Sequence, residues 1–428
     1  SPDEVMSLSR DSRLAFLLAK PAEERNKKEK DELYLGWLRF FDAEFQAATA
    51  GLAKLEQEEA EIKKRGTEAL VMHEKPEAPV AYVLFRGDYD KRRDKVEPAT
   101  PKALPPMPAD LPENRLGFAR WLMLPDQPLT ARVTVNRFWS EIFGTGIVKT
   151  TGDFGVTGEL PSHPELLDWL AVDFRESGWD MKRFFKMMVM SAAYRQSATV
   201  TPDKLAKDSD NRLLSRGPRF RMDAEMVRDY ALAASGLLVP KIGGPSVKPY
   251  QPDGVWEAVA MIGSNTREYK RDSGENLYRR SLYTFWKRAA PPASLELFNA
   301  PNRETCTVRR ERGDTPLQAL VTMDDPQFVE AARNLAQLAL EHGGANDQAR
   351  LDFMAERLLA RPLRPDERKI TGGVLKDLLA HYRAVPKAAD ELLSVGESKP
   401  DASLDKPTLA AYAMVANELL NLDEVLNK

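Results

Sequence analysis

The sequence predicts a mainly α-helical fold with a minor β component: a helical body with an N-terminal helical hairpin and a loop- and strand-rich insert. Apolar residues recur at intervals of three and four along most of the chain, which is the spacing of one helix face. Alternation with a period of two, which is typical of a strand, occurs only in short stretches. The 428 residues, of which 43% are hydrophobic and 30% charged, are enough for a substantial core.

Residues 1–66 are predicted to form the helical hairpin, which connects to the rest of the chain. Basic residues precede Gly66, as suits the C-terminal end of a helix. One apolar face is spaced by three and four: Leu35, Leu38, Phe41 and Phe45. The apolar repeat is not sustained, so we predict a hairpin rather than a coiled coil. Residues 67–113 are predicted to form a strand at 80–86 followed by a proline-rich arm.

Residues 114–428 are predicted to form the main helix-rich domain. Capping residues and first-turn prolines mark several helix starts. These starts are Ser162 before Pro164, Asp180, Asp223, Thr315 before Pro316, and Asp325 before Pro326. Within this domain, residues 241–314 are predicted to be rich in loops and strands, with a strand at 280–286 where aromatic residues alternate. A further loop is predicted at 395–406.

The charge and cysteine content exclude several classes of function. The net charge is −3, which argues against binding to nucleic acid or to an anionic membrane surface. No run of 18 apolar residues occurs, so no membrane span is expected. The only cysteine is Cys306, which excludes an internal disulfide and a multi-cysteine metal site. With only four histidines, no metal site is predicted. The Gly-x-Gly of residues 144–155 lacks the third glycine of a dinucleotide-binding turn.

The loop GDFGVTGELPSHPEL carries the candidate catalytic residues. It places Asp153, Glu159 and His163 close together on a turn rich in glycine and proline. Two carboxylates and a histidine on a rigid loop could perform acid–base chemistry. The alternative is helix capping, in which Ser162 or His163 closes the start of the following helix.

The arginine–aromatic stretch, residues 278–320, carries most of the candidate ligand-binding residues. It contains seven arginines, and guanidinium groups beside aromatic rings can hold anionic or polyhydroxylated ligands. The candidates are Arg279, Arg280, Tyr283, Trp286, Arg303, Arg309 and Arg310. The alternative is structural: the aromatic residues belong to a core strand, and the arginines pair with acids such as Glu304 and Asp314.

Three further residues are candidates with weaker signals. Tyr250 and Trp256, in the loop GGPSVKPYQPDGVW, could form the wall of a sugar subsite, although turn chemistry explains the loop equally well. Cys306 lies between Arg303 and Arg309, which would favour a reactive thiolate. No histidine lies near it in sequence, so the simpler expectation is a small buried residue.

Several blocks of the chain resemble one family. They are RLGFARWLMLPDQPLTARVTVNRFWSEIFGTGIVKTTGDFG at 115–155, GGPSVKPYQPDGVW at 243–256, YRRSLYTFWKR at 278–288 and NRETCTVRRERGDTPLQALVTMDDPQFVEAARNLA at 302–336. These blocks are similar to the planctomycete-type domain of unknown function 1553. That domain is the C-terminal module of cytochrome-c-associated exported proteins of Planctomycetes and Verrucomicrobia. The resemblance covers residues 70–428.

The resemblance implies an exported protein, periplasmic or at the cell surface, that associates with anionic or sulfated polysaccharide. It implies no cofactor in this chain. Because CxxCH is absent, haem is expected only in a domain outside this sequence or in a cytochrome-c-like partner. The family supplies no agreed catalytic residues, so whether the chain is an enzyme is left open.

Two functional hypotheses remain. In the first, the chain is the substrate-holding or catalytic part of a cytochrome-linked polysaccharide-processing system. In the second, it is a non-catalytic architectural or binding module that docks a cytochrome domain or a partner protein. The first predicts that Asp153, His163 and Arg279 or Arg310 converge in one pocket. The second predicts that internal ion pairs occupy the arginines.

Overall fold

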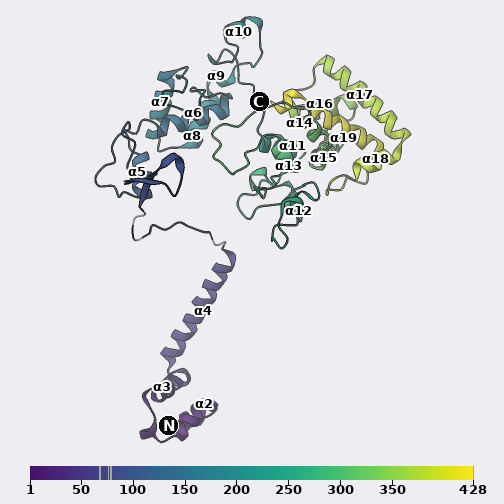
Figure 1. Ribbon diagram of the computed structural model, residues 1–428. Helices are drawn as coiled ribbons and strands as arrows, with labels where there is room; N and C mark the ends of the chain where they lie inside the picture. Colours follow the sequence, from purple (N-terminus) through teal and green to yellow (C-terminus); the bar gives the residue numbers. More distant parts are fainter. Residues whose placement is uncertain (67–68, 76, 78–79, 428) are drawn as a thin grey trace. The chain divides into compact units, whose positions relative to one another are not determined.

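A computed structural model describes residues 1–66, 69–75, 77 and 80–427. The chain divides into two compact units, Ser1–Pro98 and Ala99–Lys428 (Figure 1). The described residues form twenty α-helices and one two-stranded sheet, which confirms the predicted mainly α fold with a minor β component. None of the helices in the described ranges combines the length and apolar content needed to cross a membrane.

The first unit begins with four helices rather than the predicted two-helix hairpin. These are α1 (Pro2–Leu8), α2 (Ser12–Ala19), α3 (Lys27–Phe41) and α4 (Ala43–Arg65). The difference arises because Asp11 and Asn26 cap new helices with their side chains and so divide the first part of the segment. Leu14 of α2 packs against Gly36 of α3, where a Cβ would lie 2.6 Å from a Leu14 methyl carbon. Gly36 therefore allows these two helices to approach closely.

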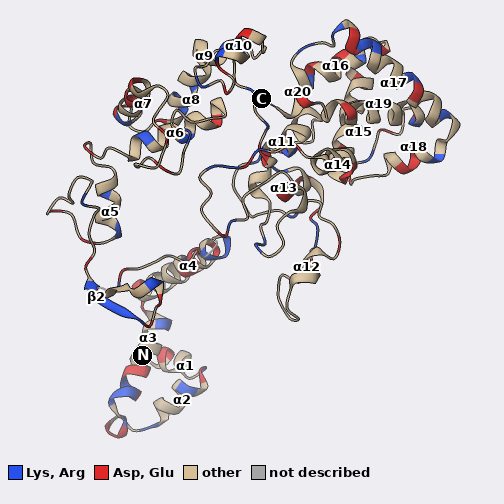
Figure 2. Ribbon diagram, turned by 45° about the horizontal axis from the view of Figure 1, so that its top comes forward, with Lys and Arg blue, Asp and Glu red and all other residues tan. Residues whose placement is uncertain are grey.

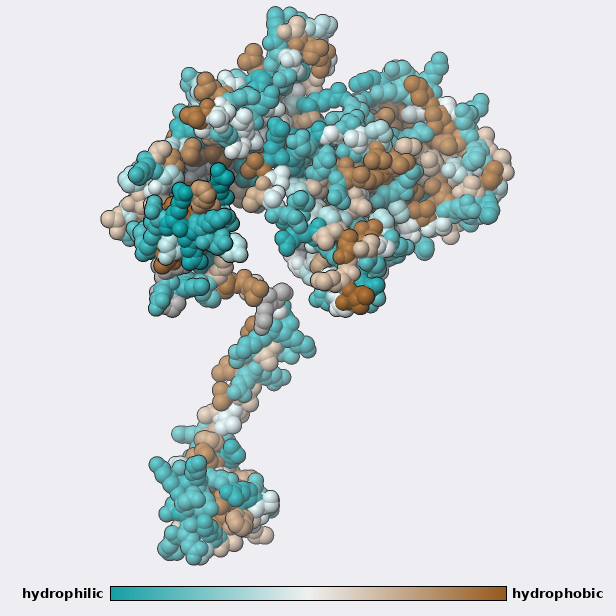
Figure 3. Space-filling view, viewed as in Figure 1, coloured by the Kyte–Doolittle hydropathy of each residue, from teal (hydrophilic) through white to brown (hydrophobic). Residues whose placement is uncertain are grey.

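Helix α4 buries none of its residues within the structure. Leu52, Leu55 and Ile62 are 57%, 63% and 61% exposed, and Figure 3 shows brown apolar side chains among teal ones along this helix. After α4, strands β1 (Ala81–Leu84) and β2 (Arg92–Val96) pair antiparallel. The first strand confirms the prediction at 80–86, whereas its partner was not predicted. The second strand carries three basic residues and is drawn largely in blue in Figure 2.

The second unit contains sixteen α-helices around two hydrophobic clusters. The smaller cluster is built mainly by α6, α7 and α8, and the larger one by α11 and by helices from α13 onward. The helix bounds are α5 Arg115–Leu122, α6 Thr130–Phe143, α7 Pro164–Glu176, α8 Met181–Met190, α9 Ala192–Arg195, α10 Pro202–Lys207, α11 Ala224–Ala234, α12 Val255–Val259, α13 Ala293–Leu297, α14 Pro316–Asp324, α15 Pro326–His342, α16 Asp347–Leu359, α17 Pro365–Ala384, α18 Pro386–Leu393, α19 Lys406–Leu420 and α20 Asp423–Leu426.

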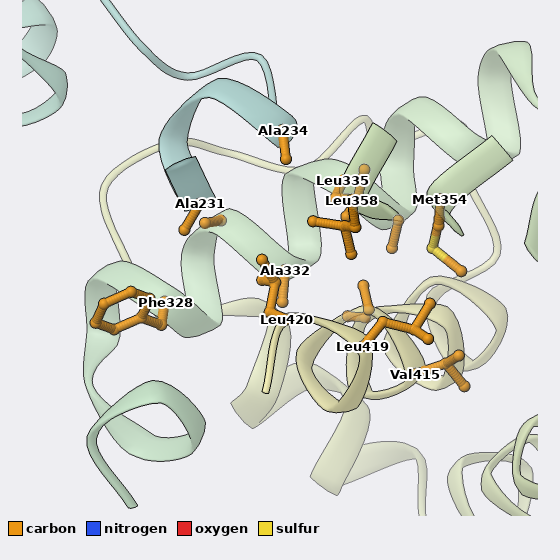
Figure 4. Packing of buried hydrophobic residues seen from close by; sticks show 14 of the residues in the cluster. Ala231, Ala234, Phe328, Ala332, Leu335, Met354, Leu358, Val415, Leu419 and Leu420 are labelled. Carbon is orange, nitrogen blue, oxygen red and sulfur yellow. The ribbon is translucent and has the colours of Figure 1, made fainter. Parts of the chain in front are cut away.

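Helices α15 and α19 form the centre of the larger cluster. Their facing residues are largely alanine, and Ala332, Ala336 and Ala416 are at most 1% exposed. Small side chains let two helix axes approach closely, and larger residues such as Leu335 and Leu419 fill the space around them (Figure 4). This core is the framework on which the loops of residues 235–315 lie.

Three of the five predicted helix starts have the expected side-chain cap. The side chains of Asp180, Thr315 and Asp325 accept backbone N–H groups at the starts of α8, α14 and α15, as predicted. The predicted loop at 395–406 lies between α18 and α19. At α7 and α11 the prediction of a side-chain cap was wrong, because His163 and Asp223 occupy the capping positions without making that bond.

The predicted strand at 280–286 is wrong. Residues Ser281–Tyr283 form a 3₁₀ turn, and another spans Gly274–Tyr278. The backbone here bonds to side chains of α11: Arg228 donates to the carbonyl of Arg279 at 2.9 Å, and Asp229 accepts the N–H of Ser281 at 2.7 Å. Since these groups are already satisfied, no continuous ladder forms. Only isolated bridges remain, Val239 with Arg279 and Val247 with Thr284.

Candidate functional site

The predicted catalytic carboxylate Asp153 closes its own turn. One of its oxygens accepts the N–H of Gly155 at 2.7 Å, and the other accepts the hydroxyl of Thr157. These hydrogen bonds, that of Thr157 first, hold the pKa of Asp153 below its usual value. Asp153 therefore shapes the turn at residues 153–157.

Glu159 and His163 lie in different surroundings. Glu159 is exposed and lines an open, mostly apolar groove of about 320 Å³, together with the Arg132–Asp168 ion pair. His163 lies 3.0 Å from the hydroxyl of Ser162 through Nδ1. It lines a separate cavity of about 20 Å³, which has room for roughly one water molecule. The three predicted catalytic residues therefore do not share one pocket.

Arg279 is directed into the protein rather than toward a ligand. Its side chain is buried, and its guanidinium donates to the carbonyls of Lys241, Gly243 and Pro245 at 3.1, 2.5 and 3.0 Å. It also lies 3.9 Å from the centre of the Tyr283 ring, whose hydroxyl accepts the N–H of Gly243. Arg279 and Tyr283 together hold the loop at residues 241–245 in place.

Arg310 and Arg312 form an ion-pair cluster with Glu141, Asp223 and Glu225, which we call the arginine junction. Arg310 donates to Glu225 and lies 4.0 Å from Asp223. Arg312 lies 3.4 Å from Asp223 and 3.7 Å from Glu141. Burial, and then the nearby Asp223 carboxylate, raise the pKa of Glu141, against the opposing effect of the arginines. The junction connects the end of α6 with the start of α11.

Of the remaining candidates in the arginine–aromatic stretch, the arginines Arg280, Arg303 and Arg309 are exposed, whereas Trp286 is half-buried against the larger hydrophobic cluster. Arg303 lies over the ring of Trp286 at 4.7 Å, and Trp286 donates to the carbonyl of Asn302 at 3.1 Å. Arg280 lies 3.7 Å from Asp229, and Arg309 lies 3.7 Å from Glu311. The expectation that Cys306 is buried is wrong: it is exposed, because residues 301–311 form a surface loop without helix or strand.

Tyr250 and Trp256 also have internal partners. The hydroxyl of Tyr250 donates to the buried carboxylate of Glu330 at 2.8 Å and accepts the N–H of Glu397 at 2.8 Å. Burial and this carboxylate raise the pKa of Tyr250. Trp256 is 2% exposed and packs against the rings of Tyr269 and Phe285. The Trp256 ring is therefore not free to stack on a sugar, and the Tyr250 hydroxyl is occupied by internal partners.

A hollow lined mainly by polar side chains, which we call the basic hollow, was not predicted from the sequence. It has a volume of about 410 Å³ and lies after α12. The residues that line it are Lys248, Gly263, Ser264, Asn265, Arg267, Glu268 and Lys270. The available signal was a polar, glycine-containing run at 263–271 with several cations. Among the described residues, no group of three or more His, Cys, Asp or Glu side chains is placed to hold a metal ion.

One comparison with known proteins gives a match. The sequence profile of the family PSD1, described as "Protein of unknown function (DUF1553)", matches residues 114–375, more than half of the chain. The matched region contains the arginine junction, the basic hollow and the loop of Asp153. No curated protein matches the chain, and no solved structure matches it.

Proposed function

We propose that this chain, which belongs to the PSD1 family of unknown function, is a non-catalytic binding module in which the arginine–aromatic stretch is a structural framework. The observation that supports this most directly is the arginine junction. Its two arginines, 32% and 21% exposed in their side chains, already pair with the three carboxylates there. A guanidinium in such a network holds the fold together and is not available to a substrate.

The surroundings of the other candidates support the same proposal. Arg279 donates to three backbone carbonyls of residues 241–245, and a ligand that took over these bonds would leave those carbonyls without this donor. Asp153 and His163 take part in separate local contacts. Because these groups are dispersed, the hypothesis of a non-catalytic binding module is favoured over that of a catalytic or substrate-holding part.

Export, association with an anionic polysaccharide and docking of a cytochrome-c-like partner stay predictions from the family resemblance. They are compatible with a binding module, because such a module can hold a glycan or a partner protein while the chemistry takes place elsewhere. The proposal includes a direct contact between this chain and either an anionic polysaccharide or a cytochrome-c-like protein.

Replacement of Arg310 tests the structural assignment. We expect Arg310→Ala to lower the free energy of unfolding by about 1–3 kcal/mol, because Glu225 would lose its cation and Asp223 would lose the more distant of its two arginine neighbours in a half-buried site. The matched control is Arg309→Ala, whose side chain is 60% exposed and whose partner Glu311 is 83% exposed. We expect that control to change stability by less than about 0.5 kcal/mol.

Chemical denaturation of both variants measures these differences, and titration with dextran sulfate oligosaccharide measures anion binding. The proposal fails if Arg310→Ala keeps wild-type stability and loses the binding of dextran sulfate that Arg309→Ala retains. That result would assign Arg310 to a ligand groove, as the first hypothesis requires.

A further inference from the structure

The basic hollow has the size and polarity of a small-ligand site. Its volume of about 410 Å³ lies within the range of pockets that hold small molecules. Three cations line it, Lys248, Arg267 and Lys270, against one carboxylate, Glu268. Ser264 and Asn265 add hydrogen-bonding groups to the same lining. The composition therefore favours an anion that also carries hydroxyl groups.

The positive charges of the hollow are largely unpaired. Within the described part of the chain, the side chains of Lys248 and Arg267 form no ion pair with a carboxylate. Lys270 approaches Glu268 only at 3.9 Å, and both side chains are mostly exposed, at 84% and 71%. The carboxylate of Asp272 is near, but it accepts the backbone N–H of Lys248 at 2.9 Å. This arrangement contrasts with the arginine junction, where every cation has a carboxylate partner.

Aromatic packing fixes the position of the hollow. The amine of Lys248 lies 5.5 Å from the centre of the Trp256 ring and 5.3 Å from that of Phe285. Lys287 lies 4.7 Å from the Trp256 ring and donates to the carbonyl of Thr266 at 2.8 Å, which ties the loop to this aromatic group. These contacts hold Lys248 and the backbone at Thr266 in place before a ligand binds, which lowers the entropy cost of binding at that part of the lining.

We propose that the basic hollow binds a sulfate or phosphate ester. Arg267 can offer two parallel N–H groups to the ester oxygens, and the ammonium groups of Lys248 and Lys270 add charge without a fixed direction. Ser264 and Asn265 are placed to bond a hydroxyl of the attached group. The proposal rests on the proposed function as a binding module and names the class of its ligand.

An ester of this kind could be part of a soluble sugar or of a lipid headgroup. The loop that precedes the hollow exposes Met261 and Ile262 at 84% and 91%, so a membrane surface must be one arm of the test. A soluble sugar ester and a lipid headgroup both present the same sulfate or phosphate ester group to the hollow. Which of the two the chain binds is decided by comparing soluble probes with vesicles.

The experiment titrates the full chain with three soluble probes by calorimetry: glucose 6-sulfate, glucose 6-phosphate and glucose. Sedimentation with phosphatidylglycerol vesicles, with neutral phosphatidylcholine vesicles as reference, gives the lipid arm. The test variant is Arg267→Gln/Lys270→Gln. The matched control, Arg383→Gln/Lys376→Gln, removes the same charges from exposed positions of α17. Thermal unfolding checks that all variants are folded.

We expect the wild type and the α17 control to bind a charged sugar ester but not glucose. The Arg267/Lys270 variant should bind it at least about tenfold more weakly, since two charge-assisted contacts are removed. Binding to anionic vesicles alone, with the same dependence on the hollow, would support the site and assign the ester to a lipid. The inference is overturned if no charged probe binds, or if both double variants bind alike. Neither result affects the comparison of Arg310→Ala with Arg309→Ala. The proposed ester site and the proposed structural role of the arginine–aromatic stretch can therefore fail separately.

Discussion

The arginine–aromatic stretch and the basic hollow use the same residue types in opposite ways. In the stretch, the guanidinium of Arg279 is buried among carbonyls, and Arg310 and Arg312 pair with carboxylates of distant segments. In the hollow, Arg267 and Lys270 face a space of about 410 Å³, with Glu268 as the single acidic residue of the lining. A cation beside an aromatic ring therefore indicates a ligand site only when no carboxylate or carbonyl of the chain already satisfies it.

The largest effect is expected at Arg228, which lies under the arginine–aromatic stretch. It is 3% exposed and donates to the carbonyls of Leu277 and Arg279 and to the side chains of Gln327 and Ser281. Arg228→Ala would leave these groups buried without a donor, so we expect a loss of about 3–5 kcal/mol in the free energy of unfolding or a failure to fold.

Two further variants keep this prediction testable. Arg228→Lys retains the charge and loses part of the hydrogen bonding, so its loss should be smaller than that of the alanine variant. Arg280→Ala, at a side chain that is 56% exposed, should cost less than about 0.5 kcal/mol. Urea denaturation measures all three. Equal stability of the Arg228 and Arg280 variants would refute the structural assignment of the stretch.

A smaller effect is expected at Tyr250, which the sequence offered as a sugar-binding residue. Tyr250→Phe removes one donor from the buried Glu330 and the acceptor of the Glu397 N–H. We expect a loss of about 1–2 kcal/mol, because buried polar groups are left unsatisfied. Tyr283→Phe is the control: among the described residues its hydroxyl accepts only the N–H of the exposed Gly243, so the loss of stability should be smaller. A role for Tyr250 in ligand binding alone would show as unchanged stability.

The smallest effect is expected at Glu141 of the arginine junction, and it depends on pH. A carboxyl group whose pKa is raised in the folded state contributes stability below its ordinary pKa of 4.5. It loses that contribution as the pH rises through the raised value. Glu141→Gln should therefore increase the free energy of unfolding at pH 7. We expect less than about 1 kcal/mol, since the side chain is 52% exposed.

Denaturation of wild type and Glu141→Gln at several pH values between 4 and 7 tests this sign. The difference between the two proteins should be least at the acidic end and grow toward neutral pH. A variant that is less stable than the wild type at pH 7 would show that attraction to Arg312 outweighs burial at this position. The Glu141–Arg312 ion pair would then stabilise the fold more than the 52% exposure of the Glu141 side chain indicates.

The helices were predictable because their signals are local. Asp180, Thr315 and Asp325 each bond to an N–H two or three residues later, so residue type and spacing were sufficient. The strand at 280–286 could not be excluded in this way. The groups that satisfy its backbone, Arg228 and Asp229, lie about fifty residues away in sequence.

The candidate site was less predictable than the fold. Arginine and aromatic residues marked the stretch at 278–320, but the partners of Arg310 and Arg312 lie 85 and 89 residues away. The basic hollow gave only a polar run at 263–271, because its aromatic neighbours and Lys287 come from other segments. In both places the function of a cation depends on which distant groups approach it.

The sequence by itself determined the mainly helical fold, several helix starts and the family, because these depend on short-range spacing and on ordered blocks of residues. The tertiary structure alone decided which cations are paired and which face open space. Pairing depends on distance and burial, since a charge in the interior must be compensated by a partner whereas an exposed charge is screened by solvent. The same arginine-rich chemistry therefore became a framework at residues 278–312 and a candidate ligand site at residues 248–270.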